Sequence, residues 1–134
     1  MQVRKVVRVA TDRDIVAARE IGKAVARELG FDGVELVVIA TAISEVARNI
    51  ISYAVCGEVE VTEAGNGQRR GIEIVARDHG PGIADVERAM QDGYSTGGGL
   101  GLGLPGCRRL VDEFSIDSCT DGGGTTVTMR KWLN

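Results

Sequence analysis

Two polar residues one helical turn apart, Glu45 and Asn49, are the first candidates for chemistry in this chain of 134 residues. The apolar residues around them recur at helical spacing, so both side chains should project from one face of a helix. A carboxylate can take a proton from a nucleophile, and an amide oxygen can bind a hard cation such as Mg²⁺. On spacing alone, an ordinary solvated helix face is the more frequent explanation.

A second group, Asp78-His79-Gly80-Pro81-Gly82, follows a strand-like segment. A carboxylate at the end of a strand can accept a hydrogen bond from an exocyclic amine, such as that of adenine. Gly80 and Gly82 would let a flat ring approach the backbone. The same residue types are typical of a plain turn, which is the alternative interpretation.

Glycine is concentrated in the stretch 80–106, where apolar residues interleave with it. Residues 97–104 read Gly-Gly-Gly-Leu-Gly-Leu-Gly-Leu and run into a helical pattern. Unsubstituted amides followed by a helix N-terminus favour an anion site. A flexible surface loop would explain the glycines but not the regular spacing of Leu100, Leu102 and Leu104.

Two familiar nucleotide motifs are excluded. Residues 101–106 match the pattern G-x-G-x-x-G, but a dinucleotide fingerprint must follow a strand and open a βαβ unit, and residues 93–99 predict no strand. No Gly-Lys-Ser/Thr occurs, so there is no P-loop. A last element, Gly124-Thr125, places a hydroxyl at the start of the final strand and by itself indicates only a hairpin turn.

The elements that must position these residues follow from periodicity and turn signals. The predicted strands are 3–10, 58–62, 72–76, 114–118 and 125–132, and the predicted helices are 15–29, 34–54, 84–92 and 104–113. This order predicts an α+β fold, a two-layer sandwich of a mixed, mostly antiparallel sheet with helices on one face.

Length and composition predict one globular domain over residues 1–134, with 43% hydrophobic and 26% charged residues. The absence of a long apolar run or a signal peptide argues against a membrane protein. A net charge of −3 gives no reason to expect nucleic acid as a partner. We therefore expect a cytoplasmic protein.

Taken in order, the helical E-x-x-x-N, the D-x-G-x-G, the glycine-rich segment and the Gly-Thr pair resemble the ATP-binding boxes of the GHKL superfamily, over roughly residues 36–128. The chain's single histidine, His79, lies in the second box and not on a helix, so a phosphoacceptor histidine is not expected. Residues 41–50, 92–96, 101–106 and 131–133 look most like the small anti-sigma-factor serine kinases, specifically their stressosome switch kinases.

The resemblance implies a Bergerat ATP-binding fold with ATP and Mg²⁺ as cofactors. Glu45 would be the general base for the acceptor hydroxyl, Asn49 would bind the Mg²⁺, Asp78 would accept from the adenine amino group, and Thr125 would support Asp78 through water. The implied nucleotide-binding set is Asn49, Asp78, Gly80, Gly82, Ser95, Thr96, Gly97, Gly98, Gly99, Leu100, Gly101, Leu102, Gly103 and Thr125. Whether Arg48, Arg108 or Arg109 neutralises the γ-phosphate stays open.

The resemblance also implies partners: a STAS-domain substrate protein within a stressosome scaffold, and a downstream phosphatase. The alternative is an anti-sigma factor that sequesters a sigma subunit and phosphorylates its antagonist. A third hypothesis, a nucleotide-gated binding module without phosphoryl transfer, is disfavoured because a pure binder would not need Glu45 as a base.

Overall fold

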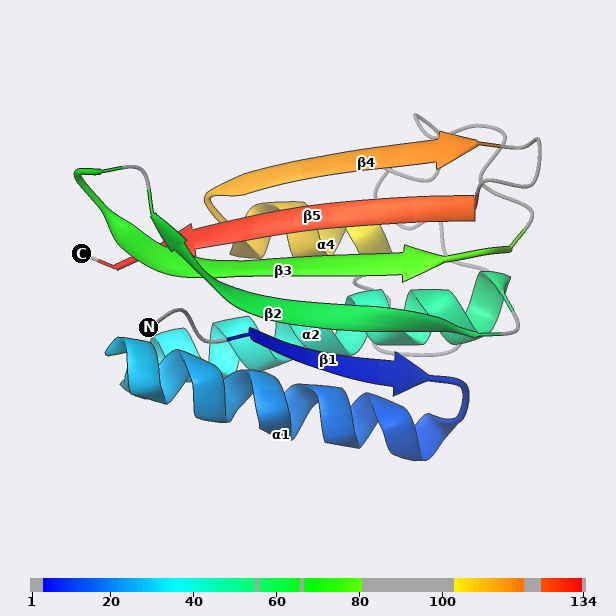
Figure 1. Cartoon of the computed structure of the whole chain (residues 1–134), viewed down its shortest axis with the longest axis horizontal. Helices are drawn as coiled ribbons and strands as arrows, with labels where there is room; N and C mark the ends of the chain where they lie inside the picture. Colours follow the sequence, from blue (N-terminus) through cyan, green and yellow to red (C-terminus); the bar gives the residue numbers. More distant parts are fainter. Residues whose placement is uncertain (1–3, 55, 66, 81–102, 120–123, 134) are drawn as a thin grey trace.

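A computed structural model of the chain describes residues 4–54, 56–65, 67–80, 103–119 and 124–133 (Figure 1). Along the chain the elements are β1 (Arg4–Val9), α1 (Asp12–Leu29), α2 (Gly33–Tyr53), β2 (Gly57–Gly65), β3 (Arg70–Asp78), α4 (Gly103–Leu110), β4 (Glu113–Cys119) and β5 (Gly124–Trp132). The predicted helix at 84–92 lies outside the described residues.

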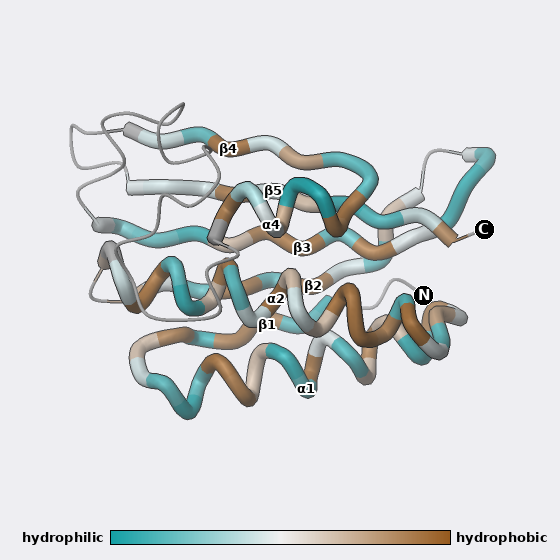
Figure 2. The backbone as a smooth tube through the Cα atoms, turned by 180° about the vertical axis from the view of Figure 1, so that it is seen from behind, coloured by the Kyte–Doolittle hydropathy of each residue, from teal (hydrophilic) through white to brown (hydrophobic). Residues whose placement is uncertain are grey.

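The strands form one sheet in the order β1-β2-β3-β5-β4. Every described pair of neighbours is antiparallel, whereas the sequence predicted a mixed, mostly antiparallel sheet. The helices α1, α2 and α4 cover one face of this sheet (Figures 1 and 2). The predicted two-layer α+β architecture is therefore confirmed, and it places β3 and β5 side by side although α4 and β4 separate them in the sequence.

The helix α2 is the central helix of the layer, and its apolar stripe forms much of the core. Ile39, Ile43, Val46 and Ile50 are almost fully buried against the strands and the other helices. Gly22 of α1 brings the two helices close, because a Cβ at that position would lie 2.1 Å from Cδ1 of Ile43. This packing holds α2 firmly and so determines where its polar side chains stand.

The N-terminus of α1 lies one turn earlier than the predicted residue 15, at Asp12. Asp14 causes the extension, because its Oδ2 accepts the backbone N–H groups of Ala10 (2.8 Å) and Thr11 (3.0 Å). The helix ends at the predicted position, where Gly30 adopts a left-handed φ of 111°.

The helix α4 ends at Leu110, so the predicted helix 104–113 was three residues too long. Contacts with β5 explain the difference. The Asp112 carboxylate accepts the Trp132 backbone N–H (2.7 Å), and the Glu113 carboxylate accepts the Trp132 indole N–H (2.7 Å). These bonds hold Asp112 and Glu113 against β5, and β4 begins at Glu113. Trp132 is itself buried.

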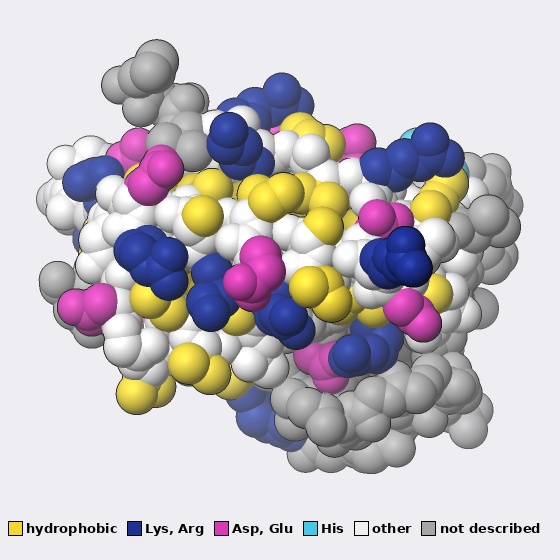
Figure 3. Space-filling model, turned by 90° about the horizontal axis from the view of Figure 1, so that it is seen from below, with side chains coloured by type: hydrophobic (Ala, Val, Ile, Leu, Met, Phe, Trp, Pro, Cys, Tyr) yellow, Lys and Arg dark blue, Asp and Glu magenta, His cyan; other side chains and the backbone are white. Residues whose placement is uncertain are grey.

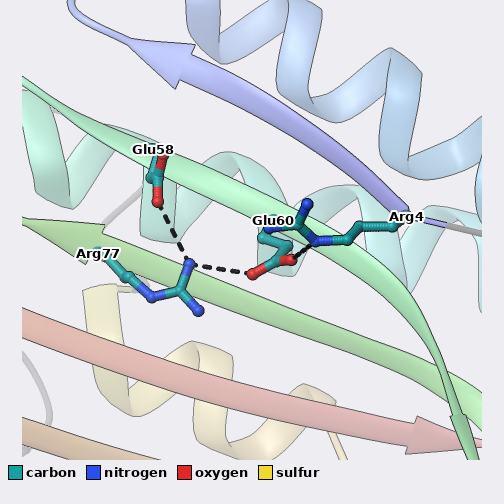
Figure 4. Close-up of polar contacts among 4 residues, drawn as sticks. All are labelled: Arg4, Glu58, Glu60 and Arg77. Carbon is teal, nitrogen blue, oxygen red and sulfur yellow. Dashed lines mark hydrogen bonds and ion pairs between the residues drawn. The ribbon is translucent and has the colours of Figure 1, made fainter.

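The open face of the sheet carries cross-strand ion pairs (Figure 4). Glu60 of β2 pairs with Arg4 of β1 and with Arg77 of β3 (3.0 Å), and Arg77 also reaches Glu58 (3.3 Å). The hydrogen bond from Arg4 holds the pKa of the Glu60 carboxyl below its usual range. This face is polar and its described charges largely satisfy one another.

Candidate functional site

The C-terminal part of α2, the end of β3, the start of α4 and the start of β5 lie at the same end of the molecule (Figure 1). Gly57 shows how closely α2 approaches β3 there. A Cβ at Gly57 would lie 3.0 Å from Cγ2 of Ile50 and 3.1 Å from Cα of Asp78. Ile50 of α2 therefore packs next to the end of β3.

Asp78 is buried, with 5% of its surface exposed, and its carboxylate is held by the backbone. Its Oδ1 accepts the N–H of Gly80 (2.9 Å) and the N–H of Thr125 (3.2 Å). No hydrogen bond from the described residues reaches Oδ2. One oxygen thus fixes the side chain, and the other is able to accept a hydrogen bond from a ligand.

Thr125 contacts Asp78 differently from the expected arrangement. Its backbone N–H bonds Asp78 directly, whereas its hydroxyl lies 2.9 Å from the hydroxyl of Ser118 on β4. The antiparallel pairing of β5 with both β3 and β4 produces both contacts. Thr125 therefore positions Asp78 with its main chain, and its own contact with a nucleotide remains a prediction.

Gly124 makes the close approach of β5 to Asp78 possible. Its φ is +73°, and a Cβ there would lie 1.9 Å from the backbone oxygen of Asp78. We expect Gly124→Ala to lower the free energy of unfolding by more than the roughly 1–2 kcal/mol of a left-handed backbone alone, because the Asp78 carbonyl must also move. The matched control is Gly67→Ala, where φ is +85° but nothing lies within 4 Å.

Urea unfolding of both variants measures this difference. The Asp78 carbonyl moves only in the first variant, so a ligand bound through Asp78 should also bind more weakly to Gly124→Ala than to Gly67→Ala. Equal stability losses in the two variants would contradict the close approach.

Glu45 is also buried, with 6% of its surface exposed, and it forms an ion pair along α2. Nη1 of Arg48 lies 2.6 Å from Oε2 of Glu45. Asn49, one turn further on, is half-buried. Sequence reasoning considered Arg48 only as a possible phosphate ligand and missed this pair, although the spacing of three residues could have indicated it.

Glu45 and Arg48 line a pocket of about 300 Å³ between α2 and α1, to which α1 contributes Arg19 and Lys23. Figure 3 shows the molecule from the side of α1, where basic side chains are interspersed with acidic and apolar ones. The pocket gives a reactant a route to the otherwise buried Glu45 carboxylate.

The helix α4 covers another side of α2. The Cys107 thiol lies 3.7 Å from the backbone oxygen of Ala42, and burial raises its pKa to about 12, with the negative charge of Glu45 adding to the shift. The thiol therefore stays protonated at neutral pH and acts as a small apolar group.

The predicted site residues of the glycine-rich segment are described only from Gly103 onward. Gly103 is the first residue of α4. The predicted positions that lie outside the described residues are Gly82, Ser95, Thr96, Gly97, Gly98, Gly99, Leu100, Gly101 and Leu102. The structure thus brings Asn49, Asp78 and the start of β5 to one end of the molecule and leaves the glycine-rich segment as a sequence prediction.

Residues 9–131 match the histidine kinase-like ATPase domain family. The chain belongs to this family. Membership of an ATPase domain family supports ATP as the ligand of the site around Asp78. Among proteins of known structure, the chain is similar to the mycobacterial sensor histidine kinase MprB, with a TM-score of 0.59 and 19% identity over 97% of both chains. That likeness confirms the fold.

Relatives in this family are similar over most of the chain. The serine/threonine-protein kinase RsbT of Bacillus subtilis is 51% identical over 127 residues, which cover 95% of both chains. The anti-sigma F factor of Thermoanaerobacter sp. is 32% identical over 122 residues, covering 87% of this chain and 83% of the relative. Within the described residues, no helix is long and apolar enough to span a membrane.

Proposed function

We propose that this chain is an ATP- and Mg²⁺-dependent protein serine/threonine kinase. The observation that carries the proposal is the buried Glu45 carboxylate, which can be reached from a pocket and lies one helical turn from Asn49. A protein that only binds nucleotide has no need of a carboxylate in that place. The 51% identity to a named serine/threonine-protein kinase supports the same activity.

The residues take the following roles in this proposal. Asp78 accepts the adenine amino group on Oδ2. Glu45 takes the proton of the acceptor hydroxyl while the oxygen of that hydroxyl attacks the γ-phosphorus. The bond between the γ-phosphorus and the β,γ-bridging oxygen breaks, and ADP is released. Phosphoryl transfer depends mainly on positioning and charge stabilisation, so a base, a metal ion and a closed site suffice.

Mg²⁺ fits the available donors. Asn49 offers a half-buried amide oxygen, and no group of three His, Cys, Asp or Glu side chains among the described residues could hold a metal ion. Mg²⁺ in nucleotide sites needs only one or two protein oxygens, since phosphates and waters complete its shell. Bound there through Asn49, it would neutralise charge on the phosphates.

For the protein substrate we propose a STAS-domain antagonist that belongs to a stressosome-type scaffold, with a downstream phosphatase as a second partner. The similarity to RsbT and to anti-sigma F factors supports a partner-switching context. The second candidate function is an anti-sigma factor, which the 32% identity to an anti-sigma F factor favours. The higher identity to the kinase RsbT makes the switch kinase our first choice.

Incubation of the purified chain with γ-labelled ATP and STAS-domain proteins of its source organism tests the proposal. We expect label on a serine or threonine of one of these proteins, and none after EDTA removes the Mg²⁺. ATP binding without any labelled protein would contradict the kinase and favour a nucleotide-gated module. Co-purification with a sigma factor in place of a STAS-domain protein would favour the anti-sigma function.

A further inference from the structure

The contacts around Glu45 identify Arg48 as the described partner of its carboxylate. Two hydroxyls line the same pocket, but Thr41 donates to the backbone oxygen of Val37 and Ser44 donates to that of Ala40, each at 2.8 Å. Within the described ranges, the hydrogen-bond partner of the Glu45 carboxylate is therefore Arg48.

We propose that Arg48 is a positioning residue for phosphoryl transfer, acting through Glu45; this role rests on the proposed kinase function. Arg48 holds Oε2 and so fixes the orientation of the Glu45 carboxylate. The second oxygen, Oε1, is left to accept the hydroxyl of the protein substrate. In this proposal Arg48 orients the base Glu45 and does not bind the γ-phosphate.

Glu45 needs the Arg48 partner because its carboxylate is buried. A carboxylate with 5% of its side chain exposed is costly to keep ionised without a partner, and the described residues give it one cation at 2.6 Å. The Arg48 side chain is 35% exposed, and both residues of the pair line the pocket. A fixed carboxylate matters because small displacements of a catalytic group cost large factors in rate.

The two basic residues that α1 contributes to the pocket do not take over the role of Arg48 in orienting Glu45. Arg19 of α1 forms its described ion pair with Glu20 (3.3 Å), and Lys23 lines the pocket without a described ion pair to Glu45. Both come from α1, whereas Arg48 is held on the same helix as Glu45, three residues away. The fixed helical spacing is what makes Arg48 suited to orienting the base.

The test compares Arg48→Ala and Arg48→Lys with the wild type in the labelled-ATP transfer assay. We expect Arg48→Ala to lower kcat about 10- to 100-fold while KM for ATP stays unchanged. We expect Arg48→Lys to recover most of kcat, because the described contact uses a single nitrogen and a positive charge. Arg27→Ala is the matched control, since Arg27 is an exposed arginine in the last turn of α1.

The outcomes separate the two proposals. A wild type that transfers no phosphate overturns the kinase function and this role with it. An active wild type with an unchanged Arg48→Ala overturns the role of Arg48 alone, and so does a faster Arg48→Ala. A higher KM for ATP would assign Arg48 to the phosphates. If Arg48→Ala fails to fold by circular dichroism, a folded Arg48→Lys that loses kcat as completely as Glu45→Ala overturns the role.

Discussion

Glu45→Ala should strongly reduce phosphoryl transfer while ATP still binds. Under the proposed mechanism Glu45 contacts the acceptor hydroxyl and not the nucleotide, so its loss removes the base and leaves the adenine site intact. General bases contribute about 10²–10⁴-fold to rate, and we expect a loss of that size in kcat. Transfer of label to the protein substrate measures the rate, and calorimetry measures the affinity for ATP.

The burial of Glu45 calls for a second variant and a control. Alanine leaves the Arg48 guanidinium without its partner, whereas Glu45→Gln keeps the size of the side chain and removes only the negative charge. Glu28→Gln makes the same chemical change on the exposed surface of α1 and should leave transfer unchanged. If Glu45→Gln transfers phosphate at the wild-type rate, Glu45 is not the base.

Asp78→Asn should weaken ATP binding about 10- to 100-fold. The asparagine oxygen can still accept the N–H groups of Gly80 and Thr125, which now bond Oδ1, so the local structure should survive. The amide nitrogen then replaces Oδ2 and presents a donor to the adenine amino group. A hydrogen bond to a charged group contributes about 1.5–3 kcal/mol, which corresponds to the expected factor.

Calorimetry with and without Mg²⁺ on the wild type and on Asp78→Asn measures this effect. The control is Asp117→Asn on β4, which makes the same substitution at an exposed position. The thermal unfolding of Asp78→Asn must also be followed, so that weaker binding is not confused with loss of the fold. An unchanged ATP affinity in a folded Asp78→Asn would contradict the adenine assignment.

The sequence by itself determined most of the described elements and their layering, although not the start of α1 or the end of α4. Alternating apolar residues predicted the strands, and Gly30 marked the end of α1, because these signals depend on residues close together in the chain. The spacing of Glu45 and Asn49 likewise follows from helix geometry alone. Each of these features is local, and local periodicity is what a sequence displays directly.

The tertiary structure decided how distant segments meet. Asp78 and Thr125 are 47 residues apart, and their hydrogen bond exists because β5 returns to lie beside β3. The close approach of Gly124 has the same origin, as does the early end of α4, since Asp112 and Glu113 both bond Trp132 of β5. Burial made the Glu45–Arg48 pair important, and burial depends on the packing of whole helices. Such contacts depend on strand order and register, which no single stretch of the chain encodes.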